Sequence, residues 1–277
     1  MTQHLLRGFG FWSGAGYPFR AGGLLRRYPS LAPYLVIPLL LNLVLGVWLY
    51  WQLLQWGENS AEIGRIYFGA WWREWGGQLP DSFHFLGEII TLISWLLDLL
   101  FKFFLLIIAG FILSQLGVIL GAPWYEKLSE KLEKILLGRL FLQNLGFGAE
   151  IRRSIAFEAK KLILLLGIGA PSLFLNVFPG FGSLAATAVG VTLTATLACL
   201  DFLNPPLERR RLSFRAKLGL IGKSLPASAG FGLSCLVLVS IPVLNLFTIP
   251  LCILAGTLFF SERLYPRYFA PQEENLS

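Results

Sequence analysis

The sequence predicts an all-α integral membrane protein with two long transmembrane helices, two re-entrant (half-penetrating) helical hairpins and amphipathic interfacial helices. Hydrophobic residues make up 55% of the 277 residues and charged residues only 14%, against about 25% charged in ordinary soluble domains. The apolar residues are gathered in long blocks, and the loops between the blocks differ in charge. We therefore expect a single membrane domain over residues 1–267, solvated by the lipid bilayer, followed by a polar tail over residues 268–277.

The first predicted span covers residues 31–55, LAPYLVIPLLLNLVLGVWLYWQLLQ, where the only ionisable side chains are tyrosines. With a rise of about 1.5 Å per residue, such a helix can cross a hydrocarbon core about 30 Å thick. A helix on the surface of a soluble domain would carry a polar face. The next segment, residues 61–77, has aromatic residues at helical spacing and predicts a short helix in the headgroup layer.

The second predicted span covers residues 89–120 and is longer than a perpendicular helix needs, so we expect it to tilt. Asp98 and Lys102 lie one helical turn apart inside it and can pair. Two readings stay open for this pair: a functional intramembrane site, or a structural pair near the headgroups or at a helix interface.

A third pattern follows Pro123, in the segment WYEKLSEKLEKILLGRL. Tyr125, Leu128, Leu132 and Ile135 share one helical face, which predicts an amphipathic cytoplasmic helix. We interpret its charged residues as a solvated face rather than a binding site.

Two further apolar blocks, residues 162–200 and 227–260, are interrupted by NVFPGFGS and IPVLNLFTIP, which contain no charged residue. The arms of the first block are about 15 to 18 residues long, whereas a span needs about 20. We interpret both blocks as re-entrant hairpins that enter from the cytoplasmic side, with turns that face the protein interior. Asn245 in the second turn is an intramembrane polar candidate. The alternative is four short full spans, six in total.

The net charge of +7 has two readings, nucleic-acid binding or membrane topology. The basic residues before the first span have no acid among them, whereas the segment after it is rich in acids. This positive-inside pattern favours topology and excludes nucleic acid as a partner. We expect a multi-pass protein of the bacterial inner membrane, with both termini in the cytoplasm and no cleavable signal peptide.

The sequence contains no constellation that indicates an enzyme. Cys199, Cys235 and Cys252 lie in apolar runs without metal-ligand spacing, so we expect them to pack in the core. No nucleophile elbow, metalloprotease motif or P-loop is present. We expect no catalytic residue, no metal and no cofactor.

Four blocks in order resemble the CysZ-type sulfate permeases and the wider etoposide-induced-protein domain family. The blocks are YPSLAPYLVIPLLLN, APWYEKLSEKLE, DFLNPPLERRRLSF and IPVLNLFTIPLCILAGT, and the similarity runs from Gly8 to Arg267. The resemblance implies an all-helical membrane fold, a homo-oligomer and uptake of sulfate for sulfur assimilation. Binding such an oxyanion requires N–H groups at a helix N-terminus and one or two guanidinium groups, without a metal. The residues that carry the resemblance are Pro38, Pro123, Pro205, Pro242, Asn245 and Pro250.

The chain departs from these permeases at their anion site, a Gly-Leu-Arg-Arg run before the first long span. Alignment on Pro38 places Ser30 and Leu31 at the start of that run, so the arginines are missing there. The nearest substitutes are Arg26 and Arg27. Two readings stay open: an anion site shifted to Arg26, Arg27, Ser30 and Leu31, or topology determinants that contact anionic lipid. The missing arginines also favour an alternative function, a non-transporting membrane scaffold or membrane-organising protein.

Overall fold

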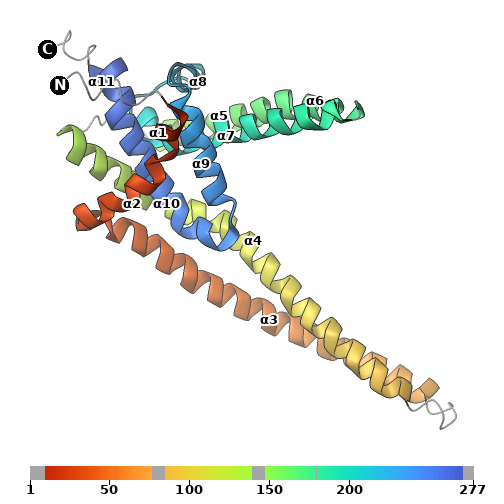
Figure 1. Ribbon diagram of the computed structural model, residues 1–277. Helices are drawn as coiled ribbons and strands as arrows, with labels where there is room; N and C mark the ends of the chain where they lie inside the picture. The colour runs from red at the N-terminus through yellow and green to blue at the C-terminus, as the bar shows by residue number, and fades with distance from the viewer. Residues whose placement is uncertain (1–9, 77–84, 139–146, 179, 271–277) are drawn as a thin grey trace. The chain divides into compact units, whose positions relative to one another are not determined.

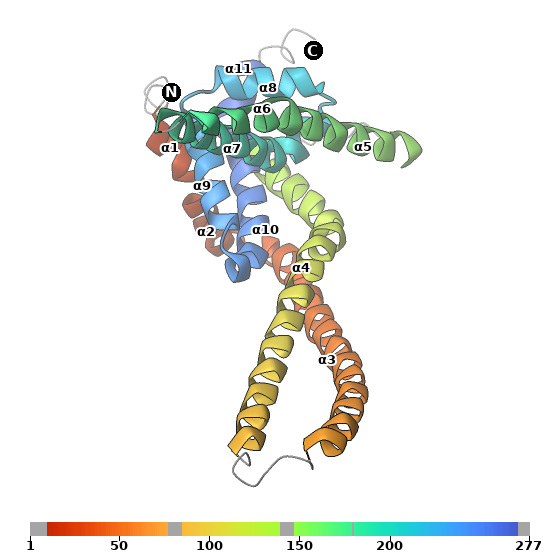
Figure 2. The same ribbon diagram turned by 90° about the vertical axis from the view of Figure 1, so that its right-hand side faces the viewer.

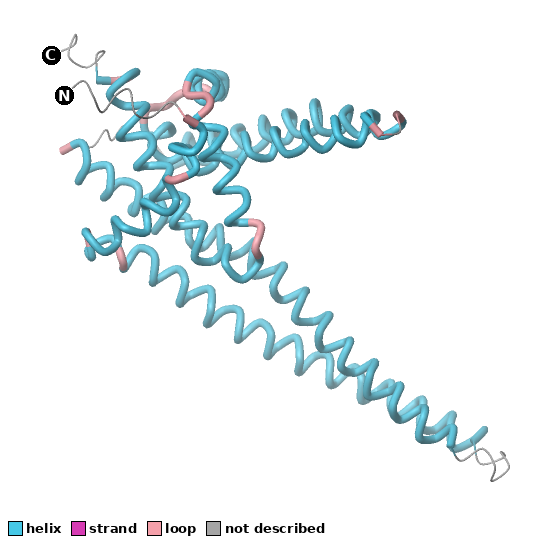
Figure 3. Tube along the Cα trace, in the orientation of Figure 1, coloured by secondary structure: helices cyan, strands magenta, loops and turns pink. Residues whose placement is uncertain are grey.

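The computed structural model describes residues 10–76, 85–138, 147–178 and 180–270. These residues are helical almost throughout and contain no strand (Figure 3). The predicted all-α fold class is therefore confirmed. The chain forms two compact units, which we describe separately: unit 1 comprises Met1–Val36 and Pro123–Ser277, and unit 2 comprises Ile37–Ala122.

Unit 2 is a hairpin made by most of α3 (Pro33–Gly76) and by the first part of α4 (Phe85–Leu137) (Figure 1). Both predicted long spans are therefore helical. Two glycines of α3 allow close packing on α4: a Cβ at Gly46 would press on Leu113, and one at Gly57 would press on Phe101 and Leu105. Small residues at such positions let apolar helices approach closely in lipid.

The expectation of a separate interfacial helix over residues 61–77 is wrong for residues 61–76, which continue α3 without a break. The physical reason is that no helix breaker separates them from the first span. Gly57 is the only weak helix former among residues 55–58, and a single glycine costs a helix only about 1 kcal/mol. The predicted amphipathic helix after Pro123 is likewise the last part of α4 rather than a separate element.

Unit 1 contains the remaining helices (Figure 2). Its N-terminal part holds α1 (Phe11–Ala15), α2 (Tyr17–Arg27) and the 3₁₀ turn η1 (Pro29–Leu31). After the end of α4 come α5 (Phe147–Leu164), the π-turn η3 (Leu165–Gly169), α6 (Ala170–Leu173), η4 (Phe174–Val177) and α7 (Phe181–Arg209). The C-terminal part holds α8 (Phe214–Lys223), α9 (Ala227–Val239), α10 (Pro242–Phe259), the π-turn η5 (Phe260–Leu264) and α11 (Tyr265–Tyr268).

The two predicted hairpins differ in length. In the first, the arms are Arg152–Val177, 26 residues, and Phe181–Arg209, 29 residues. They are longer than expected because the helices continue through the charged flanks of the apolar block. In the second, α9 has 13 residues and α10 has 18. Among the described residues, five helices are long and apolar enough to cross a membrane, or six if the bent pair α8 and α9 counts as one span.

The core of unit 1 depends on close helix crossings. A Cβ at Gly256 of α10 would overlap the carbonyl of Phe202 in α7, and a Cβ at Gly230 of α9 would overlap the carbonyl of Phe11 in α1. The three cysteines are buried in this core, as predicted.

Replacement of Gly256 by alanine is therefore expected to lower the unfolding midpoint of the detergent-solubilised protein. The added methyl group must push two backbones apart, and overpacking of this kind costs about 1 to 3 kcal/mol. The control is Gly219→Ala in α8, where an added Cβ meets no atom within 4 Å. An equal midpoint for both variants would show that the α7–α10 crossing is not tightly packed.

Candidate functional site

Among the described residues of unit 1, the most buried charge is the carboxylate of Glu133, on the last part of α4, which has no exposure to solvent. Its Oε2 accepts from Arg209 Nη2 at 2.5 Å and from Arg209 Nε at 3.1 Å. Its Oε1 lies 2.7 Å from Arg210 Nη1. Both arginines come from the C-terminal end of α7, and their side chains are only 6% exposed. One carboxylate thus holds two guanidinium groups between α4 and α7.

Neighbouring polar groups complete this arrangement. Arg209 also donates to Glu126 and to Ser129 Oγ, the latter at 2.8 Å. Ser129 Oγ lies 2.8 Å from Thr257 Oγ1 of α10. Burial raises the pKa of Glu126 above its ordinary value, and the Arg209 guanidinium opposes this shift. We call Glu126, Ser129, Glu133, Arg209 and Arg210 the buried ion network.

Aromatic rings surround the second arginine of the network. The guanidinium of Arg210 lies over the rings of Phe260, Tyr265 and Phe269, at 4.4, 5.3 and 5.4 Å from their centroids. Cation–π contacts stabilise a guanidinium that is withdrawn from water. The network and these rings together join α4, α7 and the C-terminal helices, so its arginines are engaged in holding the fold.

The interpretation of the charged residues after Pro123 as a solvated face is wrong at Glu133, and Ser129 is also buried. The predicted apolar face is confirmed, since Tyr125, Leu128 and Leu132 are at most 7% exposed. Ser129 and Glu133 follow Tyr125 by one and two helical turns, so they lie on that same face. This spacing was the signal in the sequence that could have identified them.

A second set of ion pairs occupies the other side of α7. Glu208 pairs with Arg153 of α5 at 2.7 Å and with Lys217 of α8 at 2.5 Å. Lys217 also donates to Asn204 at 2.6 Å. Two turns before Glu208 on α7, Asp201 pairs with Lys161 of α5 at 2.6 Å. Arg209, next to Glu208 in sequence, pairs instead with carboxylates of α4. These cations too are already matched by carboxylates.

The N-terminal helices are tied to the C-terminal region by a third cluster. Tyr17 donates to Glu262 at 3.1 Å and accepts from Arg263 Nε at 3.0 Å, and Arg20 pairs with Glu262 at 2.7 Å. Burial, and secondly the charge of Glu262, raise the pKa of Tyr17 above its ordinary value. The phenol therefore stays protonated and able to donate. This cluster positions α2 and hence the turn that follows it.

That turn carries the predicted anion-site residues. Arg26 and Arg27 are exposed in the last turn of α2, and Ser30 is exposed in η1. Leu31 has no exposure, so its side chain lies in the core. The turn is closed by bonds from Leu31 N–H to the Tyr28 carbonyl and from Ala32 N–H to the Pro29 carbonyl, both 3.0 Å. We call residues 26–31 the basic turn.

The arginines of the basic turn differ from those of the network. Within the described part of the chain, neither Arg26 nor Arg27 forms an ion pair; Arg27 lies 5.7 Å from the centroid of the Tyr28 ring. The start of α3 offers few free backbone donors, because Pro33 has no N–H and Leu35 and Val36 both donate to the Ala32 carbonyl. Recognition of an anion here would therefore depend on side-chain cations more than on a helix terminus.

The predicted intramembrane polar candidates, Asp98, Lys102 and Asn245, lie outside the basic turn. In unit 2, Lys102 Nζ lies 2.9 Å from Asp98 Oδ2, so the ion pair predicted from their spacing is formed. Asn245 lies in the first turn of α10 and is half-buried. The functional roles of these residues remain predictions.

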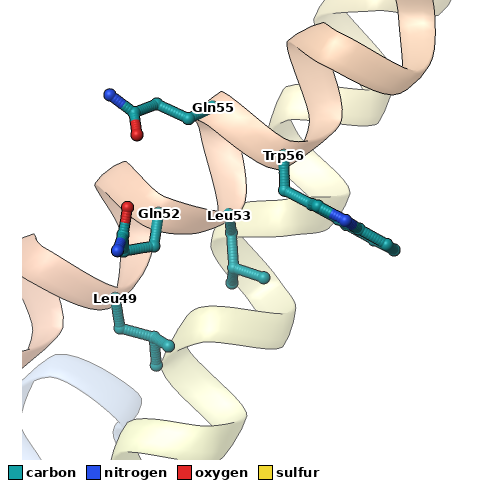
Figure 4. Close-up of a pocket in the computed structure, with 5 residues that line it drawn as sticks. All are labelled: Leu49, Gln52, Leu53, Gln55 and Trp56. Carbon is teal, nitrogen blue, oxygen red and sulfur yellow. The ribbon is translucent and has the colours of Figure 1, made fainter.

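Unit 2 also has a shallow groove of about 450 Å³, lined by one face of α3 (Figure 4). Gln52 and Gln55 are its polar residues, and Leu49, Leu53 and Trp56 are its apolar ones. It contains no charged group, so it offers no complement to an anion. Over the described residues, no group of three or more His, Cys, Asp or Glu side chains is arranged to hold a metal ion.

The long apolar helices define a multi-pass, all-helical membrane protein. Its sequence matches the family described as "Sulfate transporter CysZ/Etoposide-induced protein 2.4" over residues 17–250. The chain belongs to this family.

Relatives named "Sulfate transporter CysZ" are similar over most of their length. The protein of Vibrio cholerae is 26% identical over 250 residues, covering 88% of this chain and 91% of the relative. That of Vibrio parahaemolyticus is 26% identical over 248 residues, with 88% and 92% coverage. That of Salmonella typhimurium is 25% identical over 243 residues, with 87% and 89% coverage.

Removal of the charge at the centre of the network is expected to destabilise unit 1. Glu133→Gln leaves two buried guanidinium groups short of a counter-ion, and breaking a buried pair costs about 3 to 5 kcal/mol. The matched control is Glu130→Gln on the same helix, expected to change stability by less than about 0.5 kcal/mol. Thermal unfolding in detergent checks this. If both variants unfold at the same temperature, the network does not hold α4 to α7.

Proposed function

We propose that this protein is a transporter of a small inorganic oxyanion, with sulfate as the default substrate, and that the basic turn binds the anion. The sulfate specificity is supported by the relatives named as sulfate transporters and by family membership. The observation that carries the site is that Arg26 and Arg27 are exposed and without an ion pair in the described part of the chain. They are therefore available to a ligand.

The difference between paired and unpaired arginines in unit 1 favours the basic turn as the anion site. An anion that approached Arg209 or Arg210 would have to compete with Glu133, whose carboxylate is already bound to both guanidinium groups. At Arg26 or Arg27 the anion meets no competing carboxylate from the described residues. The basic turn also precedes α3, whose N-terminal end carries a partial positive charge of about half a unit. Guanidinium groups bind tetrahedral oxyanions by bidentate, charge-assisted hydrogen bonds.

The transport route is part of the same proposal. We propose that the second hairpin penetrates only half of the bilayer, because its arm α9 has 13 residues and a helix of this length spans about 20 Å, less than the core thickness of about 30 Å. The first hairpin is also proposed as re-entrant, although each arm is long enough to cross. Both termini are proposed to be cytoplasmic, on the positive-inside pattern.

The remaining finer features of the proposal rest on the family resemblance. The protein is proposed to form a homo-oligomer and to act in sulfur assimilation. It is proposed to pass the anion as a channel or permease, without a cofactor. The Asp98–Lys102 pair enters the proposal as a neutral unit within the second span, because each charge is balanced by the other. Asn245 is proposed to lie in the buried turn of the second hairpin.

Uptake of radiolabelled sulfate into proteoliposomes tests the function. The wild-type protein is expected to give uptake well above that of empty liposomes. The double variant Arg26→Gln, Arg27→Gln is expected to lower uptake at least about tenfold at sub-saturating sulfate, since each charge-assisted bond contributes about 1.5 to 3 kcal/mol. The control is Arg152→Gln, Arg215→Gln, which removes the same charge from exposed positions with no ion pair between described residues.

The outcomes separate the function from the site. Wild-type flux equal to that of empty liposomes would reject transport and favour the alternative, a membrane-organising protein of the same family. Normal flux in the Arg26, Arg27 double variant, with wild-type flux present, would reject the basic turn as the site and leave transport standing.

A further inference from the structure

We infer that Lys131 is a positioning and specificity-determining residue for the anion, and this inference rests on the proposed function. Lys131 lies on the last part of α4, far from the basic turn in sequence. Its Nζ donates to the backbone carbonyl of Ser30 at 3.0 Å and lies 5.1 Å from the centroid of the Tyr34 ring. The ammonium group therefore sits between the basic turn and the first turn of α3, all within unit 1.

The charge of Lys131 is not neutralised by these partners. A carbonyl oxygen and an aromatic ring orient an ammonium group, but neither carries a net negative charge. Its own helix provides no acid at pairing distance, because the residues one turn away are Lys127, Leu128, Lys134 and Ile135. Lys131 thus adds a third cation to the two arginines of the basic turn.

The helix that carries Lys131 is held in place. Ser129 and Glu133, two residues before and after it, are both fully buried in the ion network. The ammonium group is consequently presented by a fixed part of α4 rather than by a loop. By bonding the Ser30 carbonyl, it also fixes the turn that follows Arg26 and Arg27. The poor supply of backbone donors at the start of α3 makes this extra cation more important.

A third cation has a specific consequence for selectivity. Coulomb energy is proportional to the product of the charges, so its loss weakens binding of a dianion by twice the free energy lost by a monoanion. The fold-loss in affinity for the dianion is therefore the square of the fold-loss for the monoanion. Lys131 is therefore expected to favour sulfate over monovalent anions of similar size.

The test measures the KM for sulfate and the inhibition constant of nitrate in proteoliposomes. In Lys131→Met, we expect the KM for sulfate to rise about tenfold and the nitrate constant to rise about threefold, with the maximal rate nearly unchanged. Lys131→Arg is expected to restore both constants. The matched control is Lys134→Met, one turn further along α4, which is expected to keep the wild-type values.

A second variant keeps the test valid if Lys131→Met does not fold. The three native cysteines are buried, so the thiol of Lys131→Cys is the one exposed to reagents. Its modification by an aminoethyl reagent restores a cation and is expected to lower the KM for sulfate, whereas a sulfonatoethyl reagent is expected to raise it. The same protein thus serves as its own control.

The results separate this inference from the function on which it rests. Absence of wild-type uptake would reject the proposed function. If the wild-type protein takes up sulfate and Lys131→Met leaves both the KM for sulfate and the nitrate constant unchanged, the role of Lys131 is overturned. The proposed function then stands. A lower maximal rate at unchanged KM would also overturn the role of Lys131, because that result indicates a purely structural residue.

Discussion

The buried carboxylate of Glu133 is the constraint on which the structure of unit 1 depends. A charge without access to water is tolerated only when cations meet it, and two consecutive arginines at the end of α7 do so. Their pairing joins α4 to α7, and Ser129 extends the contact to Thr257 of α10. The rings around Arg210 attach the C-terminal helices to the same point. This centre therefore orders α4, α7 and the C-terminal helices, whereas the cluster of Tyr17, Arg20, Glu262 and Arg263 positions α2 before the basic turn.

This centre also divides the cations of unit 1 into two classes. Arg209, Arg210 and Lys217 have carboxylate partners and stabilise the fold. Arg26 and Arg27 are exposed and lack an ion pair in the described ranges, and the unneutralised Lys131 is directed toward the same turn. Net charge alone did not distinguish these classes, because every arginine and lysine contributes equally to it. On the proposed function, the matched charges hold the helices together and the unmatched charges bind the anion.

Hydropathy was sufficient to predict the helical membrane fold, the two long spans and the burial of the three cysteines, because a long apolar run in lipid has few alternatives to a helix. Hydropathy did not predict where the helices end. Nothing in residues 55–61 terminates α3, so the aromatic segment extends it. The ion network was missed because Glu133 was assigned to a solvated face, although its spacing from Tyr125 placed it on the buried one. The sequence could suggest Arg26 and Arg27 as site candidates, and their role stays a prediction. The contact between Lys131 and Ser30 joins distant segments and has no local signal in the sequence.

The central claim is that an oxyanion occupies the basic turn, and protection of a thiol introduced there tests it directly. Ser30 is exposed, and the native cysteines are buried, so a maleimide would report on the Ser30→Cys variant selectively. We expect sulfate to slow the modification severalfold relative to nitrate at equal ionic strength, because a bound dianion covers the thiol. Equal modification rates in sulfate and nitrate, across concentrations that support transport, would contradict the account.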